Sequence, residues 1–253
     1  MSKYEFTNET KKVKDVFGDI HTLHRIKALK DFGNVYKGDL GGWLEKESNL
    51  RQGGYCWVYD NAMVYNDAKV CDSAGVYDNA QVYGNARVYG NAQVYDDCEV
   101  YINAKVYDDA QVFGHARVCD IAKVYGFAWV YGYAWVYDDC EVYGNAKVYD
   151  EAQVFGHASV CDLAKVFSHA KIYDNAWVCD NAQVYGDTQV YGGAQVYDDC
   201  EVYSNARVYD EAQVFGHAQV HGHAKIYDEA QVHGFAEVHG NSVVCDDTEV
   251  LGD

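Results

Sequence analysis

Ala80-Gln81-Val82-Tyr83-Gly84-Asn85 is one copy of a six-residue unit that repeats without interruption through most of this chain. Every sixth residue from Val58 to Val250 is valine or isoleucine, at thirty-three consecutive positions. The residue two places before each of these is small, most often alanine. A fixed short period of this kind is typical of a solenoid, in which each repeat packs only against its neighbours.

The order of residue types within the unit predicts a short strand followed by a corner. The small residue and the valine are two apart, so on a strand both side chains point to the same, inward side. The residue between them and the residue after the valine point outward. The next two residues are mostly Gly, Asp or Asn, which tolerate the backbone conformations of a tight corner. A core of valines and small residues leaves no interior cavity, so we expect function on the faces, the corners or the ends.

The unit resembles that of the hexapeptide-repeat family, in which an aliphatic residue is followed four positions later by a small one, as Val82 is by Ala86. The resemblance covers residues 56–253. It implies an all-β fold, a left-handed parallel β-helix of about eleven three-sided coils, with three hexapeptides in each coil. Residues eighteen apart should therefore stack, which places Cys161 and Cys179 on adjacent coils, as two free thiols rather than a disulfide.

Residues 1–55 lack the repeat and predict a small β-rich cap. A turn at Phe17-Gly18-Asp19 would join two of its strands. Such a module can cover the open strand edges of the first coil, which would otherwise pair with another chain. The strand-like stretches are Tyr4–Thr7, Val13–Phe17 and His21–Leu29.

The junction between the cap and the repeat carries a second resemblance. Gly41-Gly42-Trp43 and Cys56-Trp57-Val58-Tyr59 resemble the entry segment of uncharacterised bacterial and phage hexapeptide-repeat proteins, some of which are labelled acetyltransferases. This resemblance covers roughly residues 20–60 and implies a phage or prophage origin. The label rests on fold, and fold alone does not determine function.

Charge is distributed unevenly between the two parts. Residues 1–55 carry ten Lys/Arg and eight Asp/Glu, whereas residues 56–253 carry ten and thirty-one, a net charge of −21. Nucleic acid and anionic membranes are poor partners for such a surface, and a basic protein is a good one. The alternative is that the acidic residues serve only to keep a repetitive β protein soluble. Without a signal-peptide pattern or a long apolar stretch, we expect a cytoplasmic protein with reduced cysteines.

The outward position after each valine is aromatic in most units, which predicts ladders of stacked rings. Aromatic side chains are most concentrated at Phe127, Trp129, Tyr133 and Trp135. These four should form the most apolar exposed patch, and we expect it to contact a second protomer or a partner.

The resemblance to hexapeptide-repeat acyltransferases would imply a catalytic histidine, an extruded loop and often a C-terminal helix. No insertion breaks the six-residue register, and no C-terminal helix is predicted. His115, His157 and His217 occupy corner positions where other units have Asn or Asp, so we interpret them as corner residues and predict no catalytic group and no cofactor. An acyl-CoA-dependent trimer stays the alternative function.

A metal site is the one cofactor-like feature that the sequence suggests. His221 and His239 are eighteen apart and should stack about one strand spacing, ~4.8 Å, from each other, with His223 at the adjoining corner. Three imidazoles there could hold Zn²⁺ or Ni²⁺. The alternative is that histidine only replaces tyrosine in the ladder.

Copies of one segment are rotated from face to face. Val94–Val100 returns at Val136–Val142 and again at Val196–Val202, and Val112–Ala116 returns at Val154 and Val214. The successive shifts are 42 and 60 residues, and each leaves a remainder of six when divided by eighteen. The rotated copies suggest that the function does not depend on which face carries which residues. We therefore expect a non-enzymatic protein that binds a basic host protein through its electrostatic field. Nucleic-acid mimicry is the sharper form of this hypothesis. Eleven coils would span about 53 Å, and duplex DNA of that length carries about thirty-one phosphates. Residues 56–253 carry the same number of acidic side chains. A passive spacer is the third reading. The expected partner-binding carboxylates are Asp96, Asp97, Asp108, Asp109, Asp138, Asp139, Asp198 and Asp199.

Overall fold

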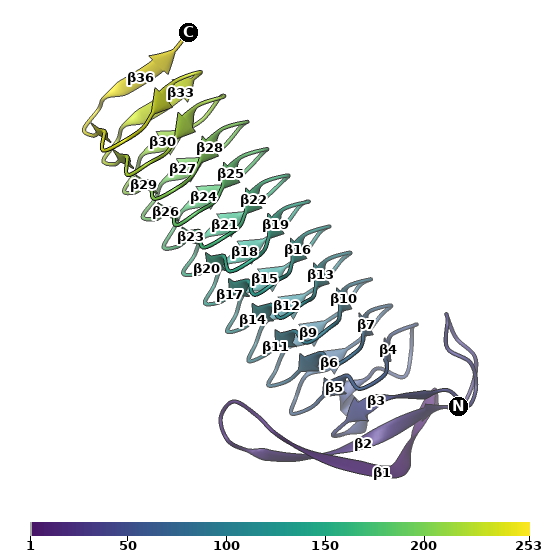
Figure 1. Ribbon diagram of the computed structural model, residues 1–253. Helices are drawn as coiled ribbons and strands as arrows, with labels where there is room; N and C mark the ends of the chain where they lie inside the picture. Colours follow the sequence, from purple (N-terminus) through teal and green to yellow (C-terminus); the bar gives the residue numbers. More distant parts are fainter. Residues whose placement is uncertain (1) are drawn as a thin grey trace. The chain divides into compact units, whose positions relative to one another are not determined.

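The chain forms two compact units, Met1–Ile121 and Ala122–Asp253, and the computed structural model describes residues 2–253 (Figure 1). Its regular structure is β throughout, apart from one 3-10 turn, η1 (Glu47–Asn49). Among the described residues, no helix has the length and apolar composition required to span a bilayer. The predicted all-β parallel solenoid with an N-terminal cap is confirmed.

Three long strands precede thirty-three short ones. The long strands are β1 (Tyr4–Lys14), β2 (Ile20–Ala28) and β3 (Leu40–Leu44). The short strands β4 to β36 follow at six-residue intervals, and most consist of only the outward residue and the repeat valine or isoleucine. They run from β4 (Trp57–Val58) to β32 (Lys225–Ile226), followed by β33 (Gln231–Gly234), β34 (Glu237–Val238), β35 (Val243–Val244) and β36 (Glu249–Gly252).

In both units every third short strand joins the same parallel sheet, so three sheets enclose the core. In Met1–Ile121 the sheets are β1-β2-β3-β5-β8-β11-β14, β4-β7-β10-β13 and β6-β9-β12. In Ala122–Asp253 they are β17-β20-β23-β26-β29-β32-β35, β16-β19-β22-β25-β28-β31-β34 and β15-β18-β21-β24-β27-β30-β33-β36. Residues eighteen apart are paired, as Val94 is with Val112, which confirms the predicted stacking.

The six positions of the unit, counted from the valine as position 1, have distinct environments. Position 1 and the small residue at position 5 are buried through most of the repeat, as Val184 and Ala182 are at 0% exposure. Position 2 holds the aromatic ladders, whose rings lie about 4.9 Å apart and nearly parallel, as in Tyr131–Tyr149. Position 6 faces outward on the strand, and positions 3 and 4 form the corner. The core is therefore a column of valine and alanine layers.

Position 3 explains the Asp and Gly residues of the corners. Its backbone has a positive φ in turn after turn, for example 61° at Asp96 and 70° at Gly132, a conformation that Gly and Asp tolerate. An aspartate there also makes a bond to the next turn: the Asp96 carboxylate accepts the backbone N–H of Gly114 at 3.0 Å. Ile102, with φ 61°, is the one β-branched residue described in this conformation.

The cap is a hairpin joined edge-on to the repeat. β1 pairs antiparallel with β2, and β2 with β3, whose Trp43 pairs with Met63 in parallel. The predicted turn is present, because the N–H groups of Phe17 and Asp19 donate to the Asp15 carboxylate at 2.9 Å. The predicted strand Tyr4–Thr7 lies within β1. Of the predicted strand Val13–Phe17, only Val13 and Lys14 belong to β1, because the turn begins at Asp15.

One buried and one partly buried polar group connect the cap to the first turn of the repeat. Lys3 is 1% exposed and donates from Nζ to the Cys56 carbonyl at 2.8 Å. Burial lowers the pKa of Lys3 from its usual value. His21 lies between Asp15 and Glu45, at 3.2 and 3.0 Å, and the Glu45 carboxylate also accepts the N–H of Asn66 in the repeat at 2.6 Å.

Candidate functional site

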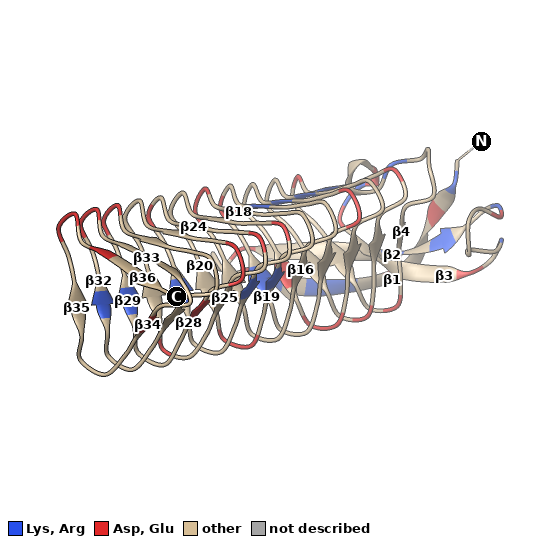
Figure 2. Cartoon of the chain, turned by 90° about the horizontal axis from the view of Figure 1, so that it is seen from above, with Lys and Arg blue, Asp and Glu red and all other residues tan. Residues whose placement is uncertain are grey.

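Positive and negative charge occupy different parts of the repeat surface. All ten Lys and Arg residues of residues 56–253 stand at position 6, on the flat strand faces. Of the thirty-one Asp and Glu residues there, twenty-six stand at corner positions 3 and 4 and five at position 6. In Figure 2 blue accordingly lies on strands such as β29 (Arg207–Val208) and β32, whereas red lies mainly on the connecting corners. The faces carry a net +5 and the corners a net −26, so the surface alternates in sign.

The predicted acidic pairs combine two different roles. Their first members are position 3 aspartates: Asp96, Asp138 and Asp198 accept the N–H of Gly114, Gly156 and Gly216 at 3.0, 3.1 and 3.1 Å, and Asp108 has the same backbone φ, 57°. These carboxylates therefore support the fold. The second members, at position 4, are turned toward solvent and toward side chains of adjacent turns. Asp97, Asp109 and Asp199 accept amide N–H bonds from Asn79, Asn91 and Asn181 at about 3.0 Å, and Asp139 lies 3.5 Å from His157.

The corner histidines are confirmed at position 4, each next to one of these carboxylates. His115 lies 3.8 Å from Asp97, and His217 lies 3.9 Å from Asp199. All three histidine side chains are at least half exposed. Each belongs to one copy of the repeated segment, so the duplication has preserved the contact along with the residues.

The highest local density of carboxylates lies at a corner that the sequence analysis did not single out. Three consecutive turns present an acidic pair at the same corner, and we call this set the acidic ridge. Hydrogen bonds join its three turns: the Glu211 N–H donates to the Asp228 carbonyl at 3.0 Å, and the Asp246 N–H donates to the Asp228 carboxylate at 3.3 Å. Within residues 2–253, no Lys, Arg or His nitrogen lies within 4.0 Å of these carboxylates. The ridge consists of Asp210, Glu211, Asp228, Glu229, Asp246 and Asp247. Spacing by eighteen residues would have revealed it.

The predicted aromatic residues are exposed but do not share one flat surface. Phe127 and Tyr133 are 60% and 65% exposed at two different corners, and Trp129 and Trp135 are each 36% exposed. Trp129 belongs to β16 (Trp129–Val130) and Trp135 to β17 (Trp135–Val136), which lie in different sheets. Lys147 Nζ stands 4.4 Å from the Trp129 ring centroid, and Trp135 packs on Tyr137 at 4.6 Å. The four residues form a band along one turn, and contact with a partner stays a prediction.

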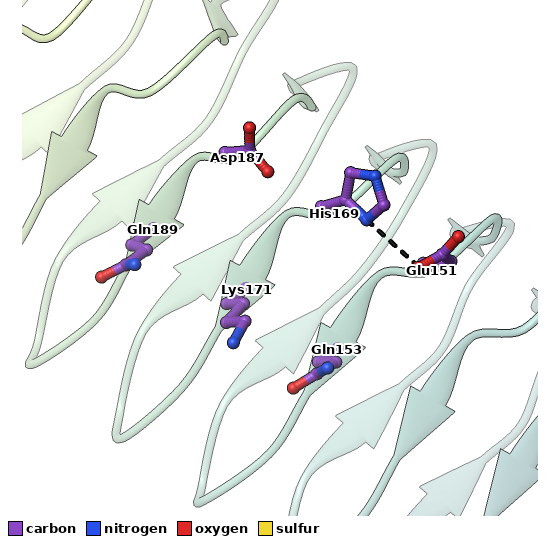
Figure 3. A pocket seen from close by; sticks show the side chains of 6 residues that line it. All are labelled: Glu151, Gln153, His169, Lys171, Asp187 and Gln189. Carbon is purple, nitrogen blue, oxygen red and sulfur yellow. Dashed lines mark ion pairs between the residues drawn. The ribbon is translucent and has the colours of Figure 1, made fainter.

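Two adjoining hollows lie on one face of the unit Ala122–Asp253. The first, of about 430 Å³, is lined by alternating corner and strand residues, with His169 paired to Glu151 at 3.3 Å beside Lys171 (Figure 3). The second, of about 450 Å³, shares Asp187 and Gln189 with it. Its remaining lining residues are Asn205, Arg207, His223 and Lys225. Both are surface hollows with mixed charge, suited to a polar ligand or to a side chain of a partner.

The histidines proposed to bind metal are arranged as a ladder with carboxylate partners. The rings of His221 and His239 stack with centroids 5.6 Å apart. His221 Nε2 lies 2.9 Å from Glu237, and this hydrogen bond lowers the pKa of Glu237. In the described part of the chain, the groups of three ligand-type side chains whose donor atoms lie within 4.8 Å of one another do not include His221, His223 or His239. A metal site at these histidines stays a prediction.

Two comparisons relate short parts of this chain to known proteins. Residues 80–96 match the family described as YdcK Beta solenoid repeat. A stretch of 42 residues, 17% of this chain, is 43% identical to the Escherichia coli (strain K12) protein named "Uncharacterized acetyltransferase YdcK". The hexapeptide-repeat resemblance is confirmed. The match spans only 13% of that relative's length, so the activity in the relative's name is not transferred to this chain.

Proposed function

We propose that this chain is a non-enzymatic interaction protein that binds a basic protein through the carboxylates at its corners. The observation that supports this most directly is the segregation of charge, with twenty-six of thirty-one acidic residues of the repeat at corners. Corners project from the solenoid, whereas the cations lie on the strand faces between them. A partner with an arginine- or lysine-rich surface would meet the carboxylates first, and long-range attraction would accelerate the encounter.

The acidic ridge is the part of the surface best suited to this role. It presents two carboxylates per turn, and turns in a parallel sheet are about 4.8 Å apart. A single DNA strand carries one phosphate per ~3.4 Å, or about 1.4 per turn of this solenoid. The ridge thus has a charge density comparable with that of a nucleic-acid strand. This comparison supports nucleic-acid mimicry against a host DNA- or RNA-binding protein as the sharper form of the proposal.

The experiment that tests the proposal compares two triple variants with the same change in charge. The first neutralises position 4 of the ridge with Glu211→Gln, Glu229→Gln and Asp247→Asn. The second neutralises Asp97, Asp139 and Asp199, which stand at three different corners, by replacing each with Asn. Neither triple touches a position 3 aspartate, so the bonds that those carboxylates accept from the backbone N–H groups of adjacent turns stay intact.

Proteins captured from lysate by the unmodified chain at low salt should be basic, and high salt should release them. The ridge triple should lose most of this capture, and the scattered triple little of it. Equal losses of captured protein in the two triple variants would indicate a diffuse electrostatic attraction without a specific site at the ridge. Capture that survives both high salt and neutralisation would refute the proposal, and failure of DNA to compete for the captured protein would refute mimicry alone.

An acetyltransferase is the second candidate, because the matched relative carries that name and because the His169–Glu151 pair stands in a surface hollow beside Lys171. A histidine held by a carboxylate is a suitable general base. Calorimetry with acetyl-CoA tests this reading. Micromolar binding that His169→Gln or Lys171→Ala weakens would favour the enzyme over the interaction protein.

A further inference from the structure

One aromatic ladder of the unit Ala122–Asp253 is interrupted by two consecutive cysteines. On this face Tyr125 and Tyr143 stack with centroids 5.0 Å apart. After two intervening turns, Tyr197 and Phe215 stack in the same way. The two position 2 residues between them are Cys161 and Cys179, after β21 (Ser159–Val160) and β24 (Trp177–Val178). Two thiols therefore stand where the ladder elsewhere has two rings.

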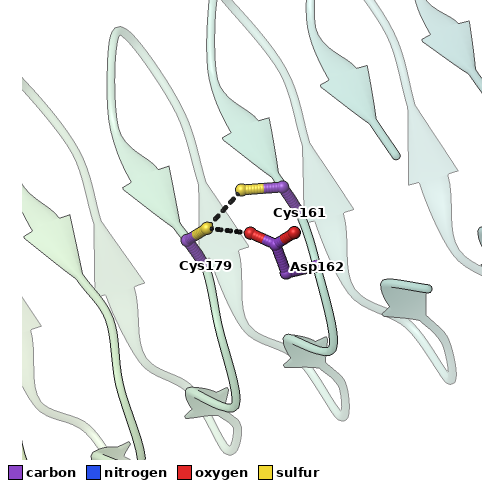
Figure 4. Close-up of side chains that lie close together, drawn as sticks. All are labelled: Cys161, Asp162 and Cys179. Carbon is purple, nitrogen blue, oxygen red and sulfur yellow. Dashed lines mark hydrogen bonds between the residues drawn. The ribbon is translucent and has the colours of Figure 1, made fainter. Parts of the chain in front are cut away.

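The two thiols and one carboxylate converge in this gap (Figure 4). Cys161 Sγ lies 2.6 Å from Cys179 Sγ, and Cys179 Sγ lies 2.6 Å from the Asp162 carboxylate. The cysteines are 1% and 2% exposed, whereas Asp162 is exposed. The three donor atoms all lie within 4.8 Å of one another. The cluster therefore has a buried sulfur side and an open carboxylate side.

We propose that Cys161, Cys179 and Asp162 together bind one thiophilic divalent cation, and that this cation is Zn²⁺. Two sulfurs and one oxygen are a donor set that zinc accepts, and the open carboxylate side leaves the fourth position to water. Zinc–sulfur bonds of about 2.3 Å in tetrahedral geometry would place the sulfurs about 3.8 Å apart. Strands about 4.8 Å apart accommodate that separation through small side-chain rotations.

The carboxylate favours a cation over a disulfide as the partner of these thiols. A disulfide joins only the two sulfurs and leaves Asp162 with no part in the bond. Burial raises the pKa of Cys161, although hydrogen bonds from Cys179 and Tyr143 oppose it, and burial together with the Asp162 hydrogen bond raises the pKa of Cys179. A bound cation would displace the thiol protons, since thiolates are the metal ligands.

The chain provides a matched control. Cys71-Asp72 has the same Cys-Asp sequence at positions 2 and 3, but the residue eighteen places later is Tyr89, so no second thiol stacks on it. The other group of three ligand-type residues within 4.8 Å in the described chain contains a single cysteine, Cys245, with Asp228 and Asp246. A site that needs two sulfurs should therefore be specific to Cys161 and Cys179.

The test uses the full chain, stripped of metal with a chelator and kept reduced with a phosphine. Zn²⁺ is titrated by calorimetry, and Co²⁺ by absorption, because the sulfur-to-cobalt charge-transfer band reports thiolate ligands and is silent for the histidine ladder. We expect one tightly bound ion per chain. Cys161→Ser and Cys179→Ser should abolish the band, Asp162→Asn should weaken binding at least tenfold, and Cys71→Ser should change nothing.

Circular dichroism of each variant shows whether it folds. If the variants of the buried cysteines fail to fold, the variant of the exposed residue, Asp162→Asn, still tests the site. Absence of a cobalt–thiolate band in the reduced parent chain would overturn the proposal. So would a band that survives in folded Cys161→Ser, or Asp162→Asn binding as tightly as the parent. A loss of two hydrogens in the mass of the unreduced chain, without metal binding after reduction, would assign the pair as a disulfide instead.

Discussion

Val184→Asp tests the assignment of inward and outward positions on a single two-residue strand, β25 (Gln183–Val184). Val184 is 0% exposed and pairs with Val166 and Val202 on the adjacent turns. Gln183, the residue before it, points outward on the same strand. The same substitution at Gln183 is therefore a control that differs only in the direction of the side chain.

The expected cost follows from the burial of the valine. Losing a fully buried valine side chain costs about 1.5–3 kcal/mol, and a neutral carboxyl group without a partner in the core costs about 1–3 kcal/mol more. The sum, about 2.5–6 kcal/mol before any cost that depends on pH, is a large fraction of the 5–15 kcal/mol that stabilises a typical domain. Gln183→Asp should change the free energy of unfolding by about 0.5 kcal/mol, as surface substitutions do.

The pH dependence of the variant gives an independent check. A carboxyl group held in the core has a folded-state pKa far above its unfolded value of about 3.9, so the folded chain binds the extra proton. Between those two values each pH unit should remove about 1.4 kcal/mol of stability. Urea unfolding followed by circular dichroism at about pH 6 and about pH 8 measures both effects. Equal costs at the two positions, or no pH dependence for Val184→Asp, would refute the packing described here.

Three further predictions concern the cap and the aromatic band. Burial lowers the pKa of His21, but its hydrogen bonds to the Asp15 and Glu45 carboxylates outweigh this effect and raise the pKa above 6.5. The stabilisation that His21 provides is complete below that value and is lost as pH rises through the folded-state pKa, so His21→Gln should remove this pH dependence from hydrogen exchange in the cap. A methyl group on Gly42 would lie 2.5 Å from the Ala62 carbonyl, so Gly42→Ala should lower the melting temperature of the cap, as seen in thermal scans, and an unchanged melt would contradict the close approach. Trp129→Glu with Trp135→Glu should leave the circular dichroism spectrum unchanged and should reduce the mass in light scattering or the capture of a partner; no change in either would leave the band without a contact role.

The sequence determined the solenoid because its signal is local and repeated. Val184 and Ala182 need only the six-residue period to be placed inward, and stacking at eighteen residues predicted the contact of Cys161 with Cys179. The cap had no such period, and β1 was divided at the wrong place because its pairing with β2 is a long-range property. A local pattern cannot reveal which distant strand satisfies a backbone hydrogen bond.

The candidate site was predicted less completely, for two reasons. The pairs of aspartates were read as equivalent, yet the position 3 residue turns its carboxylate to the next turn, as Asp96 does to Gly114, because its φ is positive. The acidic ridge was missed because its pairs read Asp-Glu or Asp-Asp at scattered places in the sequence. They become neighbours only when residues such as Glu211 and Glu229 are compared at a spacing of eighteen.

The rotated copies have a structural explanation that alters what they imply about function. The contacts join residues eighteen apart in the two stretches that are copied together, Val94–Val100 and Val112–Ala116. Asp97 contacts His115 in one copy and Asp199 contacts His217 in another, and the Gly114 N–H donates to Asp96 beside the first contact. A copy therefore carries its own partners wherever it is inserted, and insertion in a multiple of six keeps the core in register. Rotation by one face is neutral for folding and is no evidence that function is indifferent to the face. The functional surface is better sought where turns differ from the copied segment, and the acidic ridge beyond Asp210 and the cysteine pair in the aromatic ladder are two such places.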